Sequence, residues 1–185
     1  MNLIEPWKIQ IGQFNLADKF DMEQFATEVY TLYAMTGGED EAQSKLDPDL
    51  FPLILEMRDA VITPAVREFT QSCFDYPLDD FDVETNGKWI PPGEGLYPHY
   101  HPSSCFSAIV YPGDSPSALN LFDPRGNACR GYPKAIRDKF MTKMQISPKA
   151  GDVYILPSYI QHSVSYVQEE TRLSLLHEYY PRNTR

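Results

Sequence analysis

The feature that most constrains the fold is the sequence pattern from residue 81 onward, where short apolar segments alternate with turn residues. The segments are rich in β-branched and aromatic side chains, and Gly, Pro, Asn, Asp and Ser separate them, as expected for strands joined by turns. We expect strands at 106–111, 118–122, 142–146, 153–156, 163–167 and 172–180.

Two upstream regions add further strands to this set. Residues 7–14 alternate between polar and apolar side chains well enough for a first strand. Residues 81–85 and 88–90 flank Asn86-Gly87, a pair that favours a type I′ turn, so they predict a β-hairpin. A total of eight or more strands is typical of a double-sheet jelly roll or a cupin-like barrel.

The N-terminal part of the chain predicts helices instead. Asp21 matches an N-cap, apolar residues recur at helical spacing as far as Tyr33, and Gly37-Gly38 would end this helix. A second helical stretch covers about residues 50–74. Within it Pro64 must kink the helix or begin a new one, because proline has no N–H for the preceding turn.

Length and composition fit a single, mainly β domain with N-terminal helices. The 185 residues are 42% hydrophobic and 13% aromatic, which suffices for one sizeable core and excludes a disordered chain. We expect one α+β domain over residues 1–185, with mostly helical support in 1–75 and the β core with its metal site in 76–185.

Charge and cysteine usage limit the partners and the compartment. A formal net charge of −10 would repel phosphate backbones, so we expect no nucleic-acid partner. The three cysteines show no CxxC or paired spacing, which favours a reducing compartment. The sequence shows no secretory signal and no apolar run of about 18 residues, so we expect a soluble cytoplasmic protein without a membrane span.

Three of the four histidines form a candidate metal site. His99 and His101 are two residues apart on an extended segment, so their side chains point the same way and can share one metal ion. His162 follows a hydrophobic run that predicts a buried strand. Clustered imidazoles suit a borderline metal such as Fe(II) or Zn(II).

Arg172 and Ser174 form a candidate anion site on the last predicted strand, where they share one face. An arginine on an apolar strand is costly to bury without an anion, and its planar fork matches a carboxylate in two parallel hydrogen bonds. The partner could be a bound acid. It could also be an Asp or Glu of the protein, which would make a structural salt bridge.

These motifs resemble those of the Fe(II)- and 2-oxoglutarate-dependent oxygenases, and most closely the small oxygenase-like proteins of bacteria and phages. The resemblance covers about the C-terminal half of the chain. It rests on five blocks: His99-Tyr-His101-Pro-Ser-Ser with Ser107-Ala-Ile-Val-Tyr111, Phe122-Asp-Pro-Arg125, Pro148-Lys-Ala-Gly-Asp152, Pro157-Ser158 with His162, and Arg172-Leu-Ser174.

The resemblance implies a double-stranded β-helix fold, Fe(II) as cofactor and 2-oxoglutarate as cosubstrate. By this resemblance His99 and His162 would be metal ligands. Arg172 with Ser174 would hold the distal carboxylate of 2-oxoglutarate, and Tyr111 could add a hydroxyl to the same carboxylate. The implied reaction is hydroxylation of a C–H bond in an unidentified small-molecule or peptidyl substrate, with release of succinate and CO2.

One position departs from the family pattern. His101 stands where the broad superfamily has a carboxylate, and three imidazoles would leave the site with two positive charges instead of one. We favour His99, His101 and His162 together as the metal ligands. Alternatively, His101 could be the first ligand with the non-ligating Ser103 two residues beyond it, as in halogenase-like relatives, or Asp123 could reach in from a neighbouring strand.

Two loops are candidate lids over this site. The stretch 123–139 carries five cations and two aspartates in an otherwise acidic protein, which suits a substrate lid as well as a solvated surface. The loop 91–95, Pro-Pro-Gly-Glu-Gly, directly precedes the histidine pair.

Two other classes of function remain open. A cupin-like metal enzyme that does not use 2-oxoglutarate would be favoured if Arg172 pairs with a carboxylate of the protein. An ordinary cupin, however, would place a glutamate where Cys105 and Phe106 stand. A binding module on the same barrel that lost turnover would have no need of all three histidines and the arginine.

Three further residues with reactive side chains are expected to be neither metal ligands nor nucleophiles. His177 has the opposite strand parity to Arg172 and should pack on the outer face of the sheet. Cys105 lacks a neighbouring base that would activate a thiol. Ser158 lacks the Gly-x-Ser-x-Gly elbow of a serine hydrolase.

Overall fold

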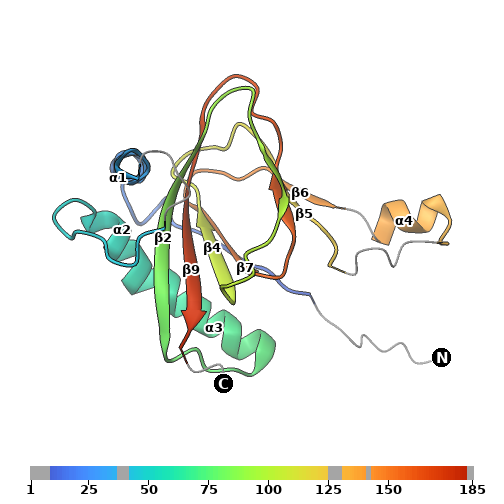
Figure 1. The fold of residues 1–185 in the computed structure, drawn as a ribbon, viewed down its shortest axis with the longest axis horizontal. Coiled ribbons are helices and arrows are strands. Elements are labelled where there is room, and N and C mark those ends of the chain that lie inside the picture. The colour runs from blue at the N-terminus through green and yellow to red at the C-terminus, as the bar shows by residue number, and fades with distance from the viewer. Residues whose placement is uncertain (1–8, 37–41, 125–130, 141–142, 183–185) are drawn as a thin grey trace.

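The protein consists of two antiparallel sheets with helices on one side, in a computed structural model that describes residues 9–36, 42–124, 131–140 and 143–182 (Figure 1). The larger sheet has the order β1 (Gly12–Asn15), β7 (Asp152–Pro157), β4 (Phe106–Val110), β9 (Arg172–Pro181) and β2 (Phe81–Ile90). The smaller sheet has the order β3 (Leu96–His99), β8 (His162–Val164), β5 (Leu119–Leu121) and β6 (Met144–Ile146). The expected mainly β fold with N-terminal helices is confirmed.

Each of the six strands predicted after residue 100 coincides with an observed strand, although most observed strands are shorter. The predicted first strand also exists, but it begins at Gly12, and Trp7 and Lys8 of that prediction lie outside the described residues. Thr142, the predicted start of β6, lies outside them as well.

The predicted hairpin at Asn86-Gly87 is wrong. Strand β2 runs straight through both residues and pairs with β9 along its whole length, with Asn86 opposite Leu176 and Gly87 opposite Leu175. A Cβ atom on Gly87 would lie 2.6 Å from the carbonyl oxygen of Val29 in the helix packed above. Gly87 is therefore needed for the close approach of helix and strand, and not for a turn.

The helices start as their sequence predicts. Helix α1 (Met22–Met35) is capped by Asp21, whose Oδ1 accepts hydrogen bonds from the backbone N–H groups of Glu23 and Gln24, both at 3.0 Å. The residues expected to end this helix, Gly37-Gly38, and the acidic run after them at 39–41 lie outside the described part of the chain.

The second helical stretch contains a π-helical turn just before Pro64. It consists of α2 (Pro52–Met57), η1 (Arg58–Ile62) and α3 (Thr63–Phe74). Because a proline cannot donate an α-helical hydrogen bond, the wider turn of η1 lets the chain pass Pro64 and continue as α3.

Glu28 of α1 joins the first two helices. Its side chain is buried, and its two carboxylate oxygens accept from the N–H groups of Leu53 and Ile54 at 3.2 and 2.9 Å. Phe51, at the N-cap position of α2, offers no side-chain cap, so a carboxylate from another helix satisfies the free donors there.

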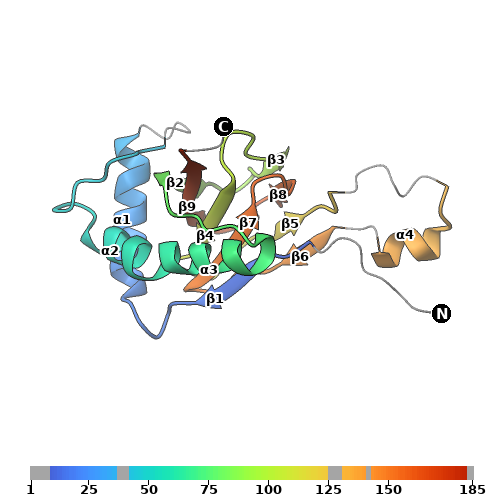
Figure 2. The same ribbon diagram turned by 90° about the horizontal axis from the view of Figure 1, so that it is seen from below.

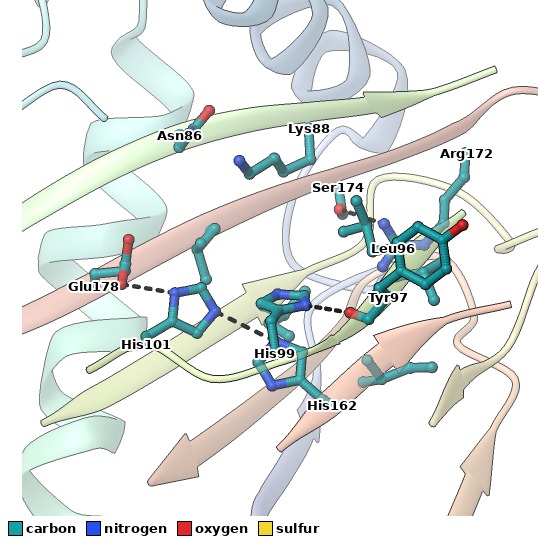
Figure 3. Close-up of a pocket in the computed structure, with 14 residues that line it drawn as sticks. Asn86, Lys88, Leu96, Tyr97, His99, His101, His162, Arg172, Ser174 and Glu178 are labelled. Atoms are coloured by element: carbon teal, nitrogen blue, oxygen red, sulfur yellow. Dashed lines mark hydrogen bonds and ion pairs between the residues drawn. The ribbon is translucent and has the colours of Figure 1, made fainter. Parts of the chain in front are cut away.

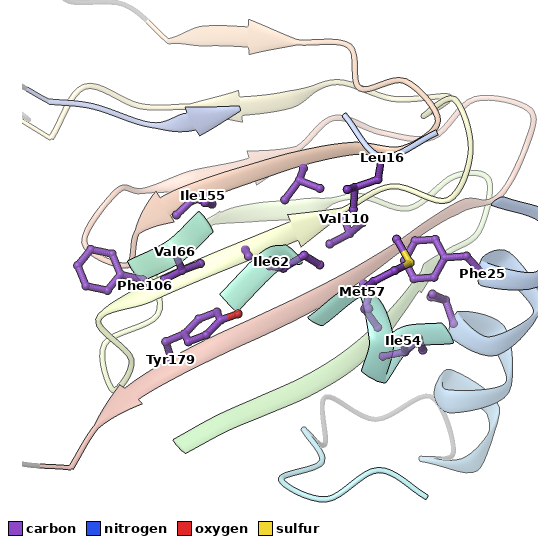
Figure 4. Packing of buried hydrophobic residues seen from close by; sticks show 14 of the residues in the cluster. Leu16, Phe25, Ile54, Met57, Ile62, Val66, Phe106, Val110, Ile155 and Tyr179 are labelled. Carbon is purple, nitrogen blue, oxygen red and sulfur yellow. The ribbon is translucent and has the colours of Figure 1, made fainter. Parts of the chain in front are cut away.

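The helices cover the outer face of the larger sheet, as Figures 2 and 4 show. Strand β9 illustrates the division, because its side chains alternate between two environments. Leu175 and Tyr179 pack beneath the helices in the main hydrophobic core. Leu176 packs on the other side, in a second cluster that lies between the two sheets. Ile109, Leu119 and Leu176 of this cluster also line a cavity between the sheets.

The insert between β5 and β6 forms helix α4 (Lys134–Phe140), which extends away from the sheets (Figure 1). Arg125 and Arg130, two of its five cations, lie outside the described residues. No helix among the described residues is long and apolar enough to cross a membrane.

Candidate metal centre

His99, His101 and His162 come together at the mouth of the cavity, where one nitrogen of each lies within 4.8 Å of the others (Figure 3). His99 ends β3 and is the direct cross-strand partner of His162, which begins β8. His101 lies beyond the end of β3, contrary to the expected shared strand, and its N–H donates to the carbonyl of Ser158 at 3.2 Å. The loop thus brings the third imidazole back to the other two.

Each imidazole is oriented through its Nδ1 atom. His99 Nδ1 lies 2.8 Å from the carbonyl oxygen of Tyr97, and His162 Nδ1 lies 3.0 Å from that of Ile160. Since a carbonyl oxygen can only accept, both Nδ1 atoms carry the proton. Their Nε2 lone pairs are then free for a metal ion, as in many protein metal sites.

The environment also keeps His162 neutral. Burial is the main cause that lowers its pKa to about 4, and the nearby His99, His101 and Arg172 add to the effect against the opposing hydrogen bond to Ile160. A neutral imidazole is the form that binds a metal.

His101 differs from the other two histidines because its partner is a carboxylate. Its Nδ1 lies 2.9 Å from Oε1 of Glu178, and its Nε2 lies 3.3 Å from Nε2 of His162. Sequence reasoning missed Glu178, although it shares strand parity with Arg172 and Ser174 and this spacing could have revealed it.

Glu178 is held in a small polar network. Its side chain is 14% exposed, and Oε1 also accepts a hydrogen bond from Ser104 Oγ at 3.1 Å. Burial alone would raise the pKa of this carboxyl, but the hydrogen bond and charge of His101, the hydrogen bond of Ser104 and the charge of Lys88 together hold the pKa below its ordinary value. Glu178 is therefore an anion at neutral pH.

The alternative ligand Asp123 does not join the histidines. Among the described residues, the group of ligand atoms that gathers here contains the three imidazoles and neither Asp123 nor Glu178. Ser103, which would be non-ligating if His101 were the first ligand, is exposed and does not line the cavity, as that alternative also allows.

Arg172 lies deeper in the cavity, 2% exposed. Its Nη1 donates to Ser174 Oγ at 3.1 Å and its Nη2 to the Tyr111 hydroxyl at 2.7 Å, while Nε has no hydrogen-bond partner in the part of the chain that the structure describes. No carboxylate of the described residues pairs with it. Because both hydroxyl oxygens accept from the guanidinium, their own O–H groups remain to be donated to an anion.

Tyr111 is fully buried beside this guanidinium. Burial is the main cause that raises the pKa of its hydroxyl, against the opposing charge and hydrogen bond of Arg172. The phenol therefore stays protonated and can act as a donor.

One cavity of about 500 Å³ connects the histidines with Arg172 and Ser174 (Figure 3). This volume is in the usual range for a small-molecule site. Asn86 also lines the cavity; its side chain is 3% exposed and its Oδ1 has no hydrogen-bond partner among the described residues. The sequence assigned Asn86 to a turn, so this polar group of the site was not foreseen.

Neither expected lid borders the cavity in the described part of the chain. Residues 131–138 are exposed and do not line it. In the loop 91–95, Gly93 N–H donates to the carbonyl of Val167 at 2.9 Å, and Val167 N–H donates to that of Glu94 at 2.8 Å. The loop is thus fastened to the chain beyond β8.

The three residues that we excluded from the chemistry lie outside the cavity. His177 is on the opposite face of β9, buried beneath the helices, with Nδ1 2.9 Å from Thr85 Oγ1. Burial raises the pKa of the Cys105 thiol, the reverse of activation. Ser158 Oγ pairs with Ser104 Oγ at 2.8 Å, and the contact of Ser158 with a histidine is through its backbone, where its carbonyl accepts from His101 N–H at 3.2 Å.

The chain matches a known family over about half of its length. Residues 88–177 match the family described as "Putative 2OG-Fe(II) oxygenase". This range contains the three histidines, Arg172 and Ser174. A search among curated protein sequences found no match.

Solved structures with the same fold are numerous. A prolyl-4-hydroxylase from Pseudomonas putida has a TM-score of 0.64 at 16% identity over 95% of this chain and 89% of that one. HygX from Streptomyces hygroscopicus, solved with nickel and 2-oxoglutarate bound, has a TM-score of 0.61 at 16% identity over 95% and 84% of the two chains. The α-ketoglutarate-dependent epimerase SnoN has a TM-score of 0.55 at 13% identity over 94% and 79%.

Proposed function

We propose that this chain, whose residues 88–177 belong to the 2OG-Fe(II) oxygenase family, is an Fe(II)- and 2-oxoglutarate-dependent hydroxylase built on a double-stranded β-helix. The observation that carries the proposal is the cavity between the two sheets. Three imidazoles meet at its mouth, and a buried arginine without a carboxylate partner among the described residues lies deeper in it.

The histidines fit a divalent metal ion. His99, His101 and His162 would hold Fe(II) through their Nε2 atoms, because their Nδ1 atoms are engaged elsewhere. Imidazole nitrogen is a good donor for iron, and three protein ligands leave positions for a cosubstrate and dioxygen.

The deeper end of the cavity fits the distal carboxylate of 2-oxoglutarate. The Arg172 guanidinium supplies the charge, and the hydroxyl of Ser174, which also lines the cavity, supplies a further donor. The Tyr111 hydroxyl accepts from Arg172 Nη2, but Tyr111 does not line the cavity. A buried cation beside an O–H group is suited to a carboxylate, and a bound carboxylate would explain why Arg172 is tolerated at 2% exposure.

When bound, Fe(II) and 2-oxoglutarate supply the oxidation: dioxygen is consumed, the oxo acid loses CO2 to become succinate, and a substrate C–H bond gains a hydroxyl group. The chain positions the reactants. Ile109, Leu119 and Leu176 give the cavity apolar walls that exclude water. Asn86 and Lys88 on β2 place polar groups in the same cavity for a small-molecule or peptidyl substrate.

The alternative of a cupin-like enzyme without 2-oxoglutarate predicted a protein carboxylate on Arg172. Its neighbours are hydroxyl groups instead, which favours the cosubstrate.

The test is succinate formation by the Fe(II)-reconstituted protein with 2-oxoglutarate under oxygen, with and without ascorbate. Turnover is expected even without a prime substrate, because the cosubstrate can be consumed in an uncoupled reaction. His162→Ala should abolish it, whereas His177→Gln, a histidine variant outside the cavity, should retain it. No succinate from the wild type, together with tight Zn(II) and no 2-oxoglutarate binding, would overturn the proposal.

A further inference from the structure

Glu178 is the one carboxylate that contacts a histidine of the cluster among the described residues. The other two histidines have neutral carbonyl partners on Nδ1. A metal held by three neutral imidazoles keeps its full charge of +2, whereas two imidazoles and one carboxylate would reduce it to +1. The distance of this single negative charge from the metal therefore affects how far the metal's charge is neutralised.

The Glu178 carboxylate is held in place by its strand and by a set of buried hydroxyl groups. Strand β9 directs Arg172, Ser174, Leu176 and Glu178 into the same cavity, so one strand serves both ends of the site. Ser104 donates to Glu178 Oε1, and Ser104 is itself paired with Ser158 Oγ at 2.8 Å, which is 3.2 Å from Ser107 Oγ. Through Ser104, these buried hydroxyls hold the carboxylate at its contact with His101 Nδ1.

We propose that Glu178 supplies the negative charge that a carboxylate ligand would otherwise bring to the metal, and that it acts through the ring of His101. This inference rests on the proposed function, because it assigns a role at the same metal site. Glu178 is a positioning residue: it binds the Nδ1 edge of His101, on the far side of the ring from Nε2.

Two effects follow from this arrangement. Accepting the Nδ1 proton fixes the tautomer of His101, so that Nε2 presents its lone pair to the metal. The negative charge also makes the imidazole a stronger donor, which raises metal affinity and stabilises Fe(III) relative to Fe(II). The departure at position 101 is thereby compensated from a distant strand.

The experiment compares metal affinity and the Fe(III)/Fe(II) potential in the wild type, Glu178→Gln and Glu84→Gln. Glutamine at 178 keeps the shape and an acceptor oxygen but removes the charge. Glu84 is the matched control, since it lies opposite Glu178 in the β2–β9 register and does not line the cavity. We expect Glu178→Gln to lower the affinity for Ni(II) and Fe(II) by about 10- to 100-fold and to make the iron potential more positive. Glu84→Gln should change neither.

Repeating Glu178→Gln in a His101→Asp protein separates the loss of charge at the metal from a general effect of the substitution on folding. In His101→Asp the carboxylate lies in the ligand position itself, so the loss of affinity caused by Glu178→Gln should shrink to less than about threefold. An equal loss in both backgrounds would overturn the inference, as would unchanged affinity and potential in Glu178→Gln. A wild-type protein that binds no metal would instead overturn the proposed function, so the two failures are distinguishable.

Discussion

Arg172 is the side chain whose surroundings most clearly require a ligand. Its guanidinium is buried at 2% exposure, two of its nitrogens contact hydroxyls, and Nε contacts nothing among the described residues. Burying a cation in this way is costly unless an anion accompanies it. The arrangement therefore supports the proposal that Arg172 is half of a binding site, and Arg172 forms no salt bridge with a carboxylate of the described residues.

Replacing Arg172 with alanine should raise the half-saturating concentration of 2-oxoglutarate at least about tenfold, the scale of a lost charged hydrogen-bond pair. Metal binding should persist, because Arg172 contacts none of the three histidines. Titration of succinate formation against 2-oxoglutarate measures the first effect, and a metal assay the second. Arg182→Ala serves as control, since that arginine pairs with Asp80 and Asp82 on the surface. Unchanged cosubstrate dependence in Arg172→Ala would remove the role that we assign to this residue.

His177 is a second buried ionisable group, and it should make stability depend on pH. Burial is the main cause that lowers its pKa to about 3, with Arg58 adding to the effect and Asp59 opposing it. An unfolded histidine has a pKa of about 6.5. Between pH 6.5 and 3 the unfolded state therefore binds a proton that the folded state does not.

The contribution of His177 to stability is complete above about pH 6.5 and decreases as the pH falls toward 3, with a slope of up to about 1.4 kcal/mol per pH unit. Urea unfolding of the metal-free protein at pH 7 and pH 5 measures this loss. His177→Gln cannot take up the proton, so it should lose less stability over the same interval. Equal losses in both proteins would show that another group dominates.

Among the secondary-structure elements, β2 is the clearest case where packing outweighs a local preference. Asn86-Gly87 would form a hairpin turn in isolation. In the protein the same residues pair with β9 along the centre of a long strand, while α1 lies against Gly87. The absence of a side chain at Gly87 lets the helix backbone contact the sheet directly.

Gly87→Ala should destabilise the protein by about 1–3 kcal/mol, the usual cost of overpacking a filled interior. The new Cβ would meet the Val29 carbonyl oxygen at 2.6 Å and the Tyr33 backbone nitrogen at 3.0 Å, and neither can move without moving α1. Gly113→Ala is the matched control, because a Cβ there meets nothing within 4 Å. Chemical denaturation of both variants checks the prediction, which fails if the two have equal midpoints.

For the protein as a whole, ligand binding should be visible as thermal stabilisation, because a ligand that binds only the folded state shifts the unfolding equilibrium. Ni(II) at about 100 times its Kd should raise Tm by about 5–10 °C. 2-Oxoglutarate should raise Tm further when metal is present. In His162→Ala the Ni(II) shift should disappear, and an equal shift in that variant would indicate binding elsewhere.

The sequence alone was sufficient for the class of fold, and it grouped the histidines, Arg172 and Ser174 that the structure brings to one cavity. Strand alternation, the Asp21 cap and the six later strands depend on local preferences that neighbouring residues determine. The pairing of Arg172 with Ser174 also follows from a local rule, the two-residue period of a strand. His99, His101 and His162 could be grouped because imidazoles are scarce in this chain and cluster in motifs that resemble a known family.

Only the tertiary structure determined that Asn86-Gly87 lies within a strand and that Glu178 is the partner of His101. Gly87 lies in a strand because helix α1, far away in sequence, packs on it. Glu178 contacts His101 because β9 crosses the larger sheet beside β4 and brings its carboxylate to a loop from another sheet. Contacts between distant segments depend on how sheets and helices assemble, and no pattern of adjacent residues encodes them.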